Sequence, residues 1–205
     1  MKRIVNKPPS VLKYSGARLP VGYVYAYFKG GWPTGGSSGV FMSFSTDGLN
    51  FTLLNNGDPV LTPPQPPEFP KGENQMRDPS VVQGPDGLFH MVWTSGITAK
   101  TIGYSSSPDL VTWSPPKRIQ VWGPEVNVEH TWAPEIFYDA DGQEYLVVWA
   151  SNVDKEDHKL YSFTTKDFEA ISPPKLFYYN NNTVIDGVIA EDVENDRYVM
   201  VGLPR

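Results

Sequence analysis

A repeated order of short strands and turns constrains the fold of this chain more than any other feature. An Asp-Gly turn at Asp86 precedes an apolar strand that contains Trp93, and the same order returns with Asp141 and Trp149, 55 and 56 residues later. The strings MSFSTDGLNF, IGYSSSPDL and LYSFTTKDF also resemble one another. Each unit reads as four short antiparallel strands, with no helical periodicity of useful length. This period and strand count are typical of a β-propeller blade rather than of a sandwich.

The repeat divides the chain into an irregular lead-in over residues 1–20 and a partial propeller over residues 21–205. The first unit contains only strands two to four, and the last contains only two strands. In the second unit, the outermost strand is predicted at residues 111–113. Because propellers have roughly four to eight blades, this material predicts an incomplete domain, truncated at its C-terminus. The blades are predicted at about 21–61, 76–121, 131–178 and 184–205.

The composition favours many short strands and argues against several classes of function. The 205 residues include 20 prolines and 18 glycines, which favour turns over long helices. The net charge of −6, without a basic run, argues against nucleic acid or an anionic membrane as partner. The absence of cysteine excludes disulfides and thiolate metal sites. No transmembrane span is predicted, and residues 1–9 do not read as a signal peptide.

Three acidic residues stand near the starts of the predicted innermost strands, in the strings MRDPSVV, TWAPEIF and VIDGVIA. We expect Asp78, Glu135 and Asp186 at nearly equivalent positions around one funnel. Asp78 precedes Pro79, which predicts extended geometry at a strand mouth; an aspartate that only caps a turn is the alternative. Like charges gathered in one pocket are unfavourable, which points to catalysis or metal binding. Glycoside hydrolysis uses such paired carboxyl groups.

These strings resemble the five-bladed β-propeller glycoside hydrolases of family 43, the arabinofuranosidase and xylosidase group. The resemblance covers roughly residues 21–203 and implies an inverting mechanism, with Asp78 as the general base. Asp186 is then the residue that tunes the pKa of the acid, and the acid itself is a glutamate of the following blade, which this sequence does not contain. The matching pieces are Arg77-Asp78-Pro79-Ser80, Trp132-Ala133-Pro134-Glu135, Val184-Ile185-Asp186, YSSSPDLVTW and FTTKDF.

Further substrate-binding candidates surround these strands. Arg77 is expected to contact a sugar hydroxyl or to hold Asp78 ionised, with a plain surface ion pair as the alternative. Glu135 is expected to contact substrate or to act electrostatically on the site, with a strand-start glutamate paired with a neighbouring cation as the alternative. Trp32, in a Gly-rich loop, and Trp132 are candidates for stacking on a sugar ring or lining the site.

The histidines and the repeated tryptophans receive structural expectations as well. Through the resemblance, His130 is a candidate to lie near a calcium ion or water cluster in the central channel, although a locally hydrogen-bonded loop histidine is the alternative. No other cofactor is expected. His90 is predicted to be structural and His158 to be solvated, while Trp93 and its repeat Trp149 are predicted to pack between blades.

The leading hypothesis is a glycosidase that acts on α-L-arabinofuranosides or β-D-xylosides of plant-type polysaccharides. The resemblance implies a secreted or cell-envelope protein, with the cytoplasm left open, and the sequence does not fix the oligomeric state. The alternative is a non-catalytic carbohydrate-binding propeller or an inactive truncated fragment. A fructosidase-like reading is disfavoured because the chain has no Asn-Asp-Pro motif and no cysteine, and a phosphorylase-like reading because no basic phosphate pocket is evident.

Overall fold

The computed structural model describes residues 13–14, 17–18, 22–30, 37–67, 69–192, 195 and 197–204 of the chain. Trp32 lies outside the described residues. The elements are short strands and two 3₁₀ turns, η1 (Asn55–Gly57) and η2 (Val153–Lys155). The strands are β1 (Lys13–Tyr14), β2 (Ala17–Arg18), β3 (Tyr23–Gly30), β4 (Ser37–Ser45), β5 (Thr52–Leu53), β6 (Arg77–Gln83), β7 (Phe89–Thr94), β8 (Thr101–Ser107), β9 (Lys117–Gln120), β10 (Thr131–Asp139), β11 (Glu144–Ser151), β12 (Lys159–Thr165), β13 (Lys175–Tyr178), β14 (Val184–Asp192) and β15 (Arg197–Pro204).

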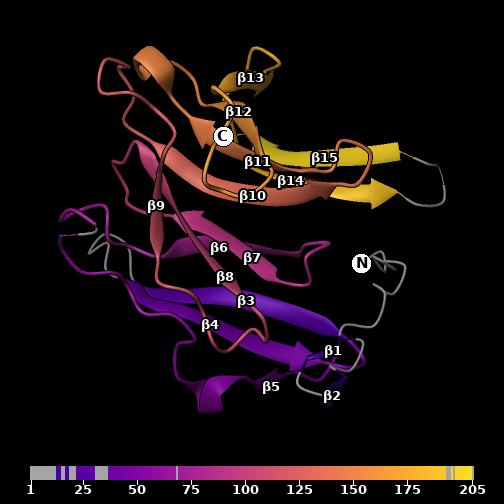
Figure 1. Cartoon of the computed structure of the whole chain (residues 1–205). Coiled ribbons are helices and arrows are strands. Elements are labelled where there is room, and N and C mark those ends of the chain that lie inside the picture. The colour runs from indigo at the N-terminus through magenta and orange to yellow at the C-terminus, as the bar shows by residue number, and fades with distance from the viewer. Residues whose placement is uncertain are drawn as a thin grey trace.

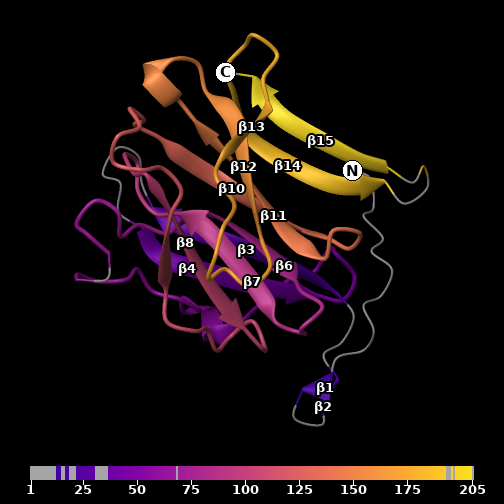
Figure 2. The same cartoon turned by 45° about the horizontal axis from the view of Figure 1, so that its top comes forward.

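Two of the sheets are complete four-stranded blades with neighbouring strands in chain order. The second blade has the order β6-β7-β8-β9 and the third has the order β10-β11-β12-β13, all antiparallel. The innermost strands β6, β10 and β14 lie beside one another, so the blades fan around a common side (Figures 1 and 2). The prediction of an all-β, partial propeller is confirmed. Among the described residues, no helix has the length and apolar character needed to cross a membrane.

The first blade (β3, β4 and β5) corresponds to strands two to four of a complete blade. The innermost strand of the second blade, β6, contacts β3 and then β4, just as β10 contacts β7 and then β8. The sequence expectation for this unit is therefore met by the described strands. The fourth blade consists of β14 and β15, paired antiparallel.

One turn device repeats after the third strand of three blades. A hydroxyl that ends the strand accepts the N–H three residues on, and the aspartate two residues on accepts two further N–H groups. In the second blade this turn uses the amides of Val111 and Thr112, so the strand predicted at residues 111–113 is wrong. The outermost strand is β9 instead. The hydroxyl–aspartate pairs are Ser45–Asp47, Ser107–Asp109 and Thr165–Asp167.

The hydrophobic core lies between blades, and the period of two along the strands explains it. On β7, Met91 and Trp93 pack toward the first blade, whereas Val92 packs toward the third. On β11, Trp149 packs toward the second blade and Val148 toward the fourth. Trp93 and Trp149 are fully buried, so their predicted packing between blades is confirmed.

Candidate active site

Each innermost strand carries a β-bulge at the same place. Two residues of β6, Asp78 and Pro79, lie opposite the single residue Trp93 of β7. Ala133-Pro134 of β10 and Asp186-Gly187 of β14 form the corresponding bulges. The first residue of each bulge has a left-handed backbone, with φ of 48° at Asp78, 46° at Ala133 and 52° at Asp186. The bulges therefore set the direction of the side chains at the mouth of the funnel.

The extended geometry predicted for Asp78 from the following proline is wrong. The steric preference before proline disfavours the right-handed helical region, and the chain meets it here with a left-handed residue inside the bulge. An aspartate tolerates this conformation better than most residues. Pro79 has no N–H to offer the ladder, and a bulge is one of the few strand positions that suits it.

The equivalence predicted for Glu135 is also corrected. Asp78 and Asp186 occupy the same bulge position, but the third blade has Ala133 there. Glu135 lies two residues further along β10, where it is the first paired residue after the bulge. Ser80 of β6 and Val188 of β14 take the equivalent positions in their blades. Aligning the proline of Asp78-Pro79 with that of Ala133-Pro134 is the sequence signal that would have found this offset.

Asp78 is a partly buried carboxyl group that interacts with residues of the second and the fourth blade. Burial raises its pKa, the hydroxyl of Thr94 and the charge of Arg77 lower it, and the charge of Asp186 raises it. Asp186 is exposed at the start of β14, so the two bulge carboxylates share one electrostatic environment. The guanidinium of Arg77 lies over the ring of Phe28, 4.8 Å from its centroid, which fixes the cation near Asp78.

Glu135 points toward the second blade. Its Oε2 accepts a hydrogen bond of 2.8 Å from the hydroxyl of Ser80. Burial raises the pKa of Glu135 to about 7, more than the Ser80 hydrogen bond lowers it. The carboxyl group therefore titrates near neutral pH. The partner of Glu135 is the Ser80 hydroxyl and not the cation expected as the alternative.

His130 and Trp132 form a ring stack with His158. The rings of His130 and Trp132 lie 3.8 Å apart, and His158 lies 5.1 Å from each. The ring nitrogens of His130 and His158 are 3.0 Å apart, and the indole N–H of Trp132 donates to the carbonyl of Ile97. His158 is half-buried on this stack rather than solvated as predicted, because the starts of β10 and β12 both flank the end of β11.

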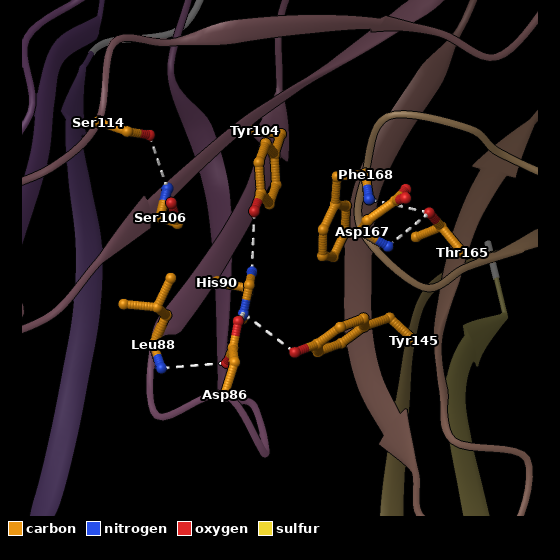
Figure 3. Close-up of polar contacts among 10 residues, drawn as sticks. All are labelled: Asp86, Leu88, His90, Tyr104, Ser106, Ser114, Tyr145, Thr165, Asp167 and Phe168. Carbon is orange, nitrogen blue, oxygen red and sulfur yellow. Dashed lines mark hydrogen bonds and ion pairs between the residues drawn. The ribbon is translucent and has the colours of Figure 1, made fainter.

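His90 lies at the opposite end of the blades and is structural, as predicted. Its Nδ1 lies 2.8 Å from the Tyr104 hydroxyl, and its Nε2 lies 3.2 Å from Asp86 and 3.0 Å from the hydroxyl of Tyr145. Figure 3 shows Tyr145 reaching this imidazole from the third blade. Burial lowers the pKa of His90, so the neutral ring is favoured.

Two cavities lie outside the cluster of bulges. One of about 480 Å³ borders His90, Tyr104 and Lys117, and one of about 780 Å³ borders Glu73, Lys100 and Arg118. None of the predicted site residues that the structure describes lines either cavity. Within the described ranges, no three His, Asp or Glu side chains gather in a way that could hold a metal ion. The calcium ion or water cluster expected near His130 stays a prediction, and we derive no step through a metal.

The comparison with protein families decides the assignment. Residues 20–202 match the family described as "Probable glycosyl hydrolase domain", whose short name relates it to glycoside hydrolase family 43. The chain belongs to this family. No curated protein matches the chain significantly.

Solved structures similar to this glycosyl hydrolase domain share its fold at low identity. An exo-β-1,3-galactanase from Phanerochaete chrysosporium has a TM-score of 0.61 at 16% identity, over 91% of this chain and 42% of that one. An α-L-arabinofuranosidase from Clostridium thermocellum has 0.58 at 16%, over 89% and 58%. An α-L-arabinanase from Penicillium chrysogenum has 0.61 at 14%, over 88% and 53%. The chain thus spans about half the length of these proteins, and its architecture is that of part of a five-bladed propeller.

The hydroxyl groups that hold the two partly buried carboxyls were missed by sequence reasoning. Thr94 donates to Asp78, and Ser80 donates to Glu135. Ser80 ends the Arg77-Asp78-Pro79-Ser80 string but was given no role of its own, and Thr94 belongs to no motif. Ser80 could have been found from its register with Glu135 across the repeat, but nothing in the sequence singles out Thr94.

Proposed function

We propose that this domain contributes to a glycosidase that cleaves α-L-arabinofuranosides or β-D-xylosides by inverting single displacement. The observation that supports the proposal most is the pair of carboxylates, Asp78 and Asp186, in equivalent bulges of two innermost strands. The similarity to an arabinofuranosidase and an arabinanase favours arabinose over xylose. The galactanase keeps a galactoside in the set of substrates to be tested.

Asp78 is the proposed general base. Its carboxylate would take a proton from a water molecule as the water oxygen bonds to the anomeric carbon and the bond to the leaving oxygen breaks. Burial brings the pKa of this carboxyl up toward the pH range where a base works best. The proton for the leaving oxygen must come from an acid that we do not assign in this chain. In an inverting enzyme we expect the acid about 6.5–9.5 Å from Asp78.

Asp186 and the ring stack complete the proposed site. The charge of Asp186 acts on Asp78 and, by the resemblance, on the acid. Arg77 and the stacked Trp132 and His130 are proposed to contact the sugar. Glu135, whose side chain is directed at Ser80, is proposed to act on the electrostatics of the site rather than on substrate.

The first test replaces the base in a protein that carries both this domain and the acid. Asp78→Asn should lower kcat/KM on aryl α-L-arabinofuranosides by about 10³-fold, since general base catalysis contributes roughly 10²–10⁴-fold, while the fold is kept. Asp141→Asn, an exposed turn aspartate, is the matched control and should leave the rate unchanged. Aryl β-xylosides and β-galactosides are measured alongside, and NMR of the first product identifies its anomer.

Two outcomes decide against parts of this proposal. Hydrolysis by Asp78→Asn at the wild-type rate would remove the base assignment. Binding of arabino- or xylo-oligosaccharides without product release, by a protein that carries both this domain and the acid, would favour the non-catalytic carbohydrate-binding domain.

A further inference from the structure

Thr94 makes two hydrogen bonds that connect Asp78 to the neighbouring blade. It is the last residue of β7, 1% exposed, and pairs with Arg77 across the second blade. Its hydroxyl Oγ1 donates to Oδ2 of Asp78 at 2.9 Å. The same oxygen accepts the N–H of Ala133 at 2.8 Å, and Ala133 is the bulge residue of the third blade.

The direction of the hydrogen bonds follows from the donors available. A backbone N–H can only donate, so the Thr94 oxygen must accept from Ala133. An ionised carboxylate can only accept, so the single hydroxyl proton of Thr94 is directed to Oδ2 of Asp78. The Ala133 amide thus fixes the rotation of the threonine, and the threonine fixes the carboxylate. Oδ1 is the carboxylate oxygen that does not accept this hydrogen bond.

A second hydroxyl repeats this arrangement on the other side of the same bulge. Ser80 Oγ accepts the N–H of Ile136 at 3.2 Å and donates to Glu135 at 2.8 Å. The two hydroxyls of the second blade therefore hold the β10 bulge by the amides of Ala133 and Ile136. At both places between these blades, a hydroxyl of the second blade accepts a hydrogen bond from a backbone N–H of β10 and donates one to a carboxyl group.

Strand pairing by itself does not require a hydroxyl at position 94. Ala150 takes the equivalent place in the third blade, paired with Trp132, and Leu203 takes it in the fourth, paired with Ile185. Both are apolar. Among the three described bulges, a hydroxyl stands there in the blade whose bulge carboxylate also faces a bulge amide of the next blade, and an apolar residue stands there in the other two.

We propose that Thr94 is a positioning residue that orients the Asp78 carboxylate and makes its orientation depend on the third blade. The proposal rests on the base function proposed for Asp78. The charges that act on Asp78 besides this hydroxyl are those of Arg77 and Asp186, and neither is altered by substitution of Thr94.

The test compares Thr94→Val, which keeps the shape and removes the hydroxyl, with Thr94→Ser, which keeps the hydroxyl. The pKa of Asp78 is read directly by NMR titration of ¹³C-labelled carboxyl groups, assigned with Asp78→Asn. In Thr94→Val the pKa should rise by about one unit, because a hydrogen bond to the charged form is lost. The acid limb of the kcat/KM profile should move to higher pH by the same amount, with KM little changed. Thr94→Ser should restore both.

Thr165→Val is the matched control. Thr165 is also a buried strand-end threonine that donates to a carbonyl and accepts an amide, but it lies at the turn of β12. This variant should lose stability without moving the pKa of Asp78 or the pH profile. A shift of equal size in Thr165→Val, or none in Thr94→Val, would overturn the proposal.

A measurement on the wild-type chain decides the matter if Thr94→Val does not fold. The ¹⁵N–¹H signal of Ala133 should titrate in step with Asp78 and stop doing so in Asp78→Asn, since the two are joined through one hydroxyl. An Ala133 amide that ignores the titration contradicts the proposal. Failure of the base assignment is seen separately, as unchanged activity of Asp78→Asn, whatever the NMR titrations show.

Discussion

At the scale of single residues, burial decides what the carboxyl groups of this domain can do. Asp47, exposed in a turn, has a lowered pKa because backbone and side-chain donors surround it. Asp78 and Glu135 have raised pKa values because desolvation outweighs their hydroxyl partners. A carboxyl group therefore stays ionised in a turn at one end of the blades, whereas burial at the other end favours its protonated form.

Glu135 gives a prediction for stability against pH. Its pKa rises from 4.5 to about 7 on folding, so the folded state holds a proton that the unfolded chain has released between these values. Stability should therefore fall as pH rises through this window, by about 3 kcal/mol for this group. In Glu135→Gln the group no longer titrates, so the variant should gain that amount relative to wild type between pH 5 and pH 8. Urea unfolding at both pH values measures it, and a constant difference would contradict the raised pKa.

At the scale of elements, the turn between β6 and β7 of the second blade packs against Tyr145 of the third blade. A Cβ on Gly84 would collide with the Tyr145 hydroxyl and approach Asp86 and His90. Because the Asp86 carboxylate accepts from Nε2 of His90, the proton of the neutral ring lies on Nε2, and Nδ1 accepts from Tyr104. The turn was expected from Gly-Pro-Asp-Gly, but its need for a glycine at the first position comes from the third blade.

This contact predicts a pair of coupled substitutions. Gly84→Ala should destabilise the domain by about 2 kcal/mol through overpacking. Tyr145→Phe should cost about 1 kcal/mol through loss of its hydrogen bond. The double variant should lose less than the sum by about 1 kcal/mol, because removing the hydroxyl makes room for the methyl group.

The control for this cycle is Gly123→Ala, because the three atoms nearest to its Cβ all belong to the exposed Glu125 carboxylate. Its effect should add to that of Tyr145→Phe. Strict additivity in the Gly84 cycle, measured by denaturant unfolding, would show that the turn does not sense the next blade.

At the scale of the whole molecule, the described blades are packed to different degrees. The second and third blades bury apolar side chains on both faces, in the clusters toward each neighbour. The fourth blade buries one face. On its strands β14 and β15, the exposed fraction is 50% for Val188, 62% for Val201 and 56% for Leu203. The local free energy of opening should therefore be higher in the second and third blades than in the fourth.

Hydrogen exchange tests the order. In the chain of 205 residues, the amides of β14 and β15 should exchange fastest among the paired strands, and those of β7, β8 and β11 slowest, because local opening there breaks packing on two faces. Protection in β15 equal to that in β7 would mean that the blades open together rather than from the end.

The sequence by itself determined the all-β class, the blade period and the alternation that buries Trp93 and Trp149, because these depend on local spacing that repeats. It also identified the glycosidase resemblance of Asp78 and Asp186. Only the tertiary structure decided the left-handed bulge at Asp78 and the link through Thr94 to Ala133. The physical reason is that a bulge register and a hydrogen bond between blades depend on partners dozens of residues away, which no local pattern encodes.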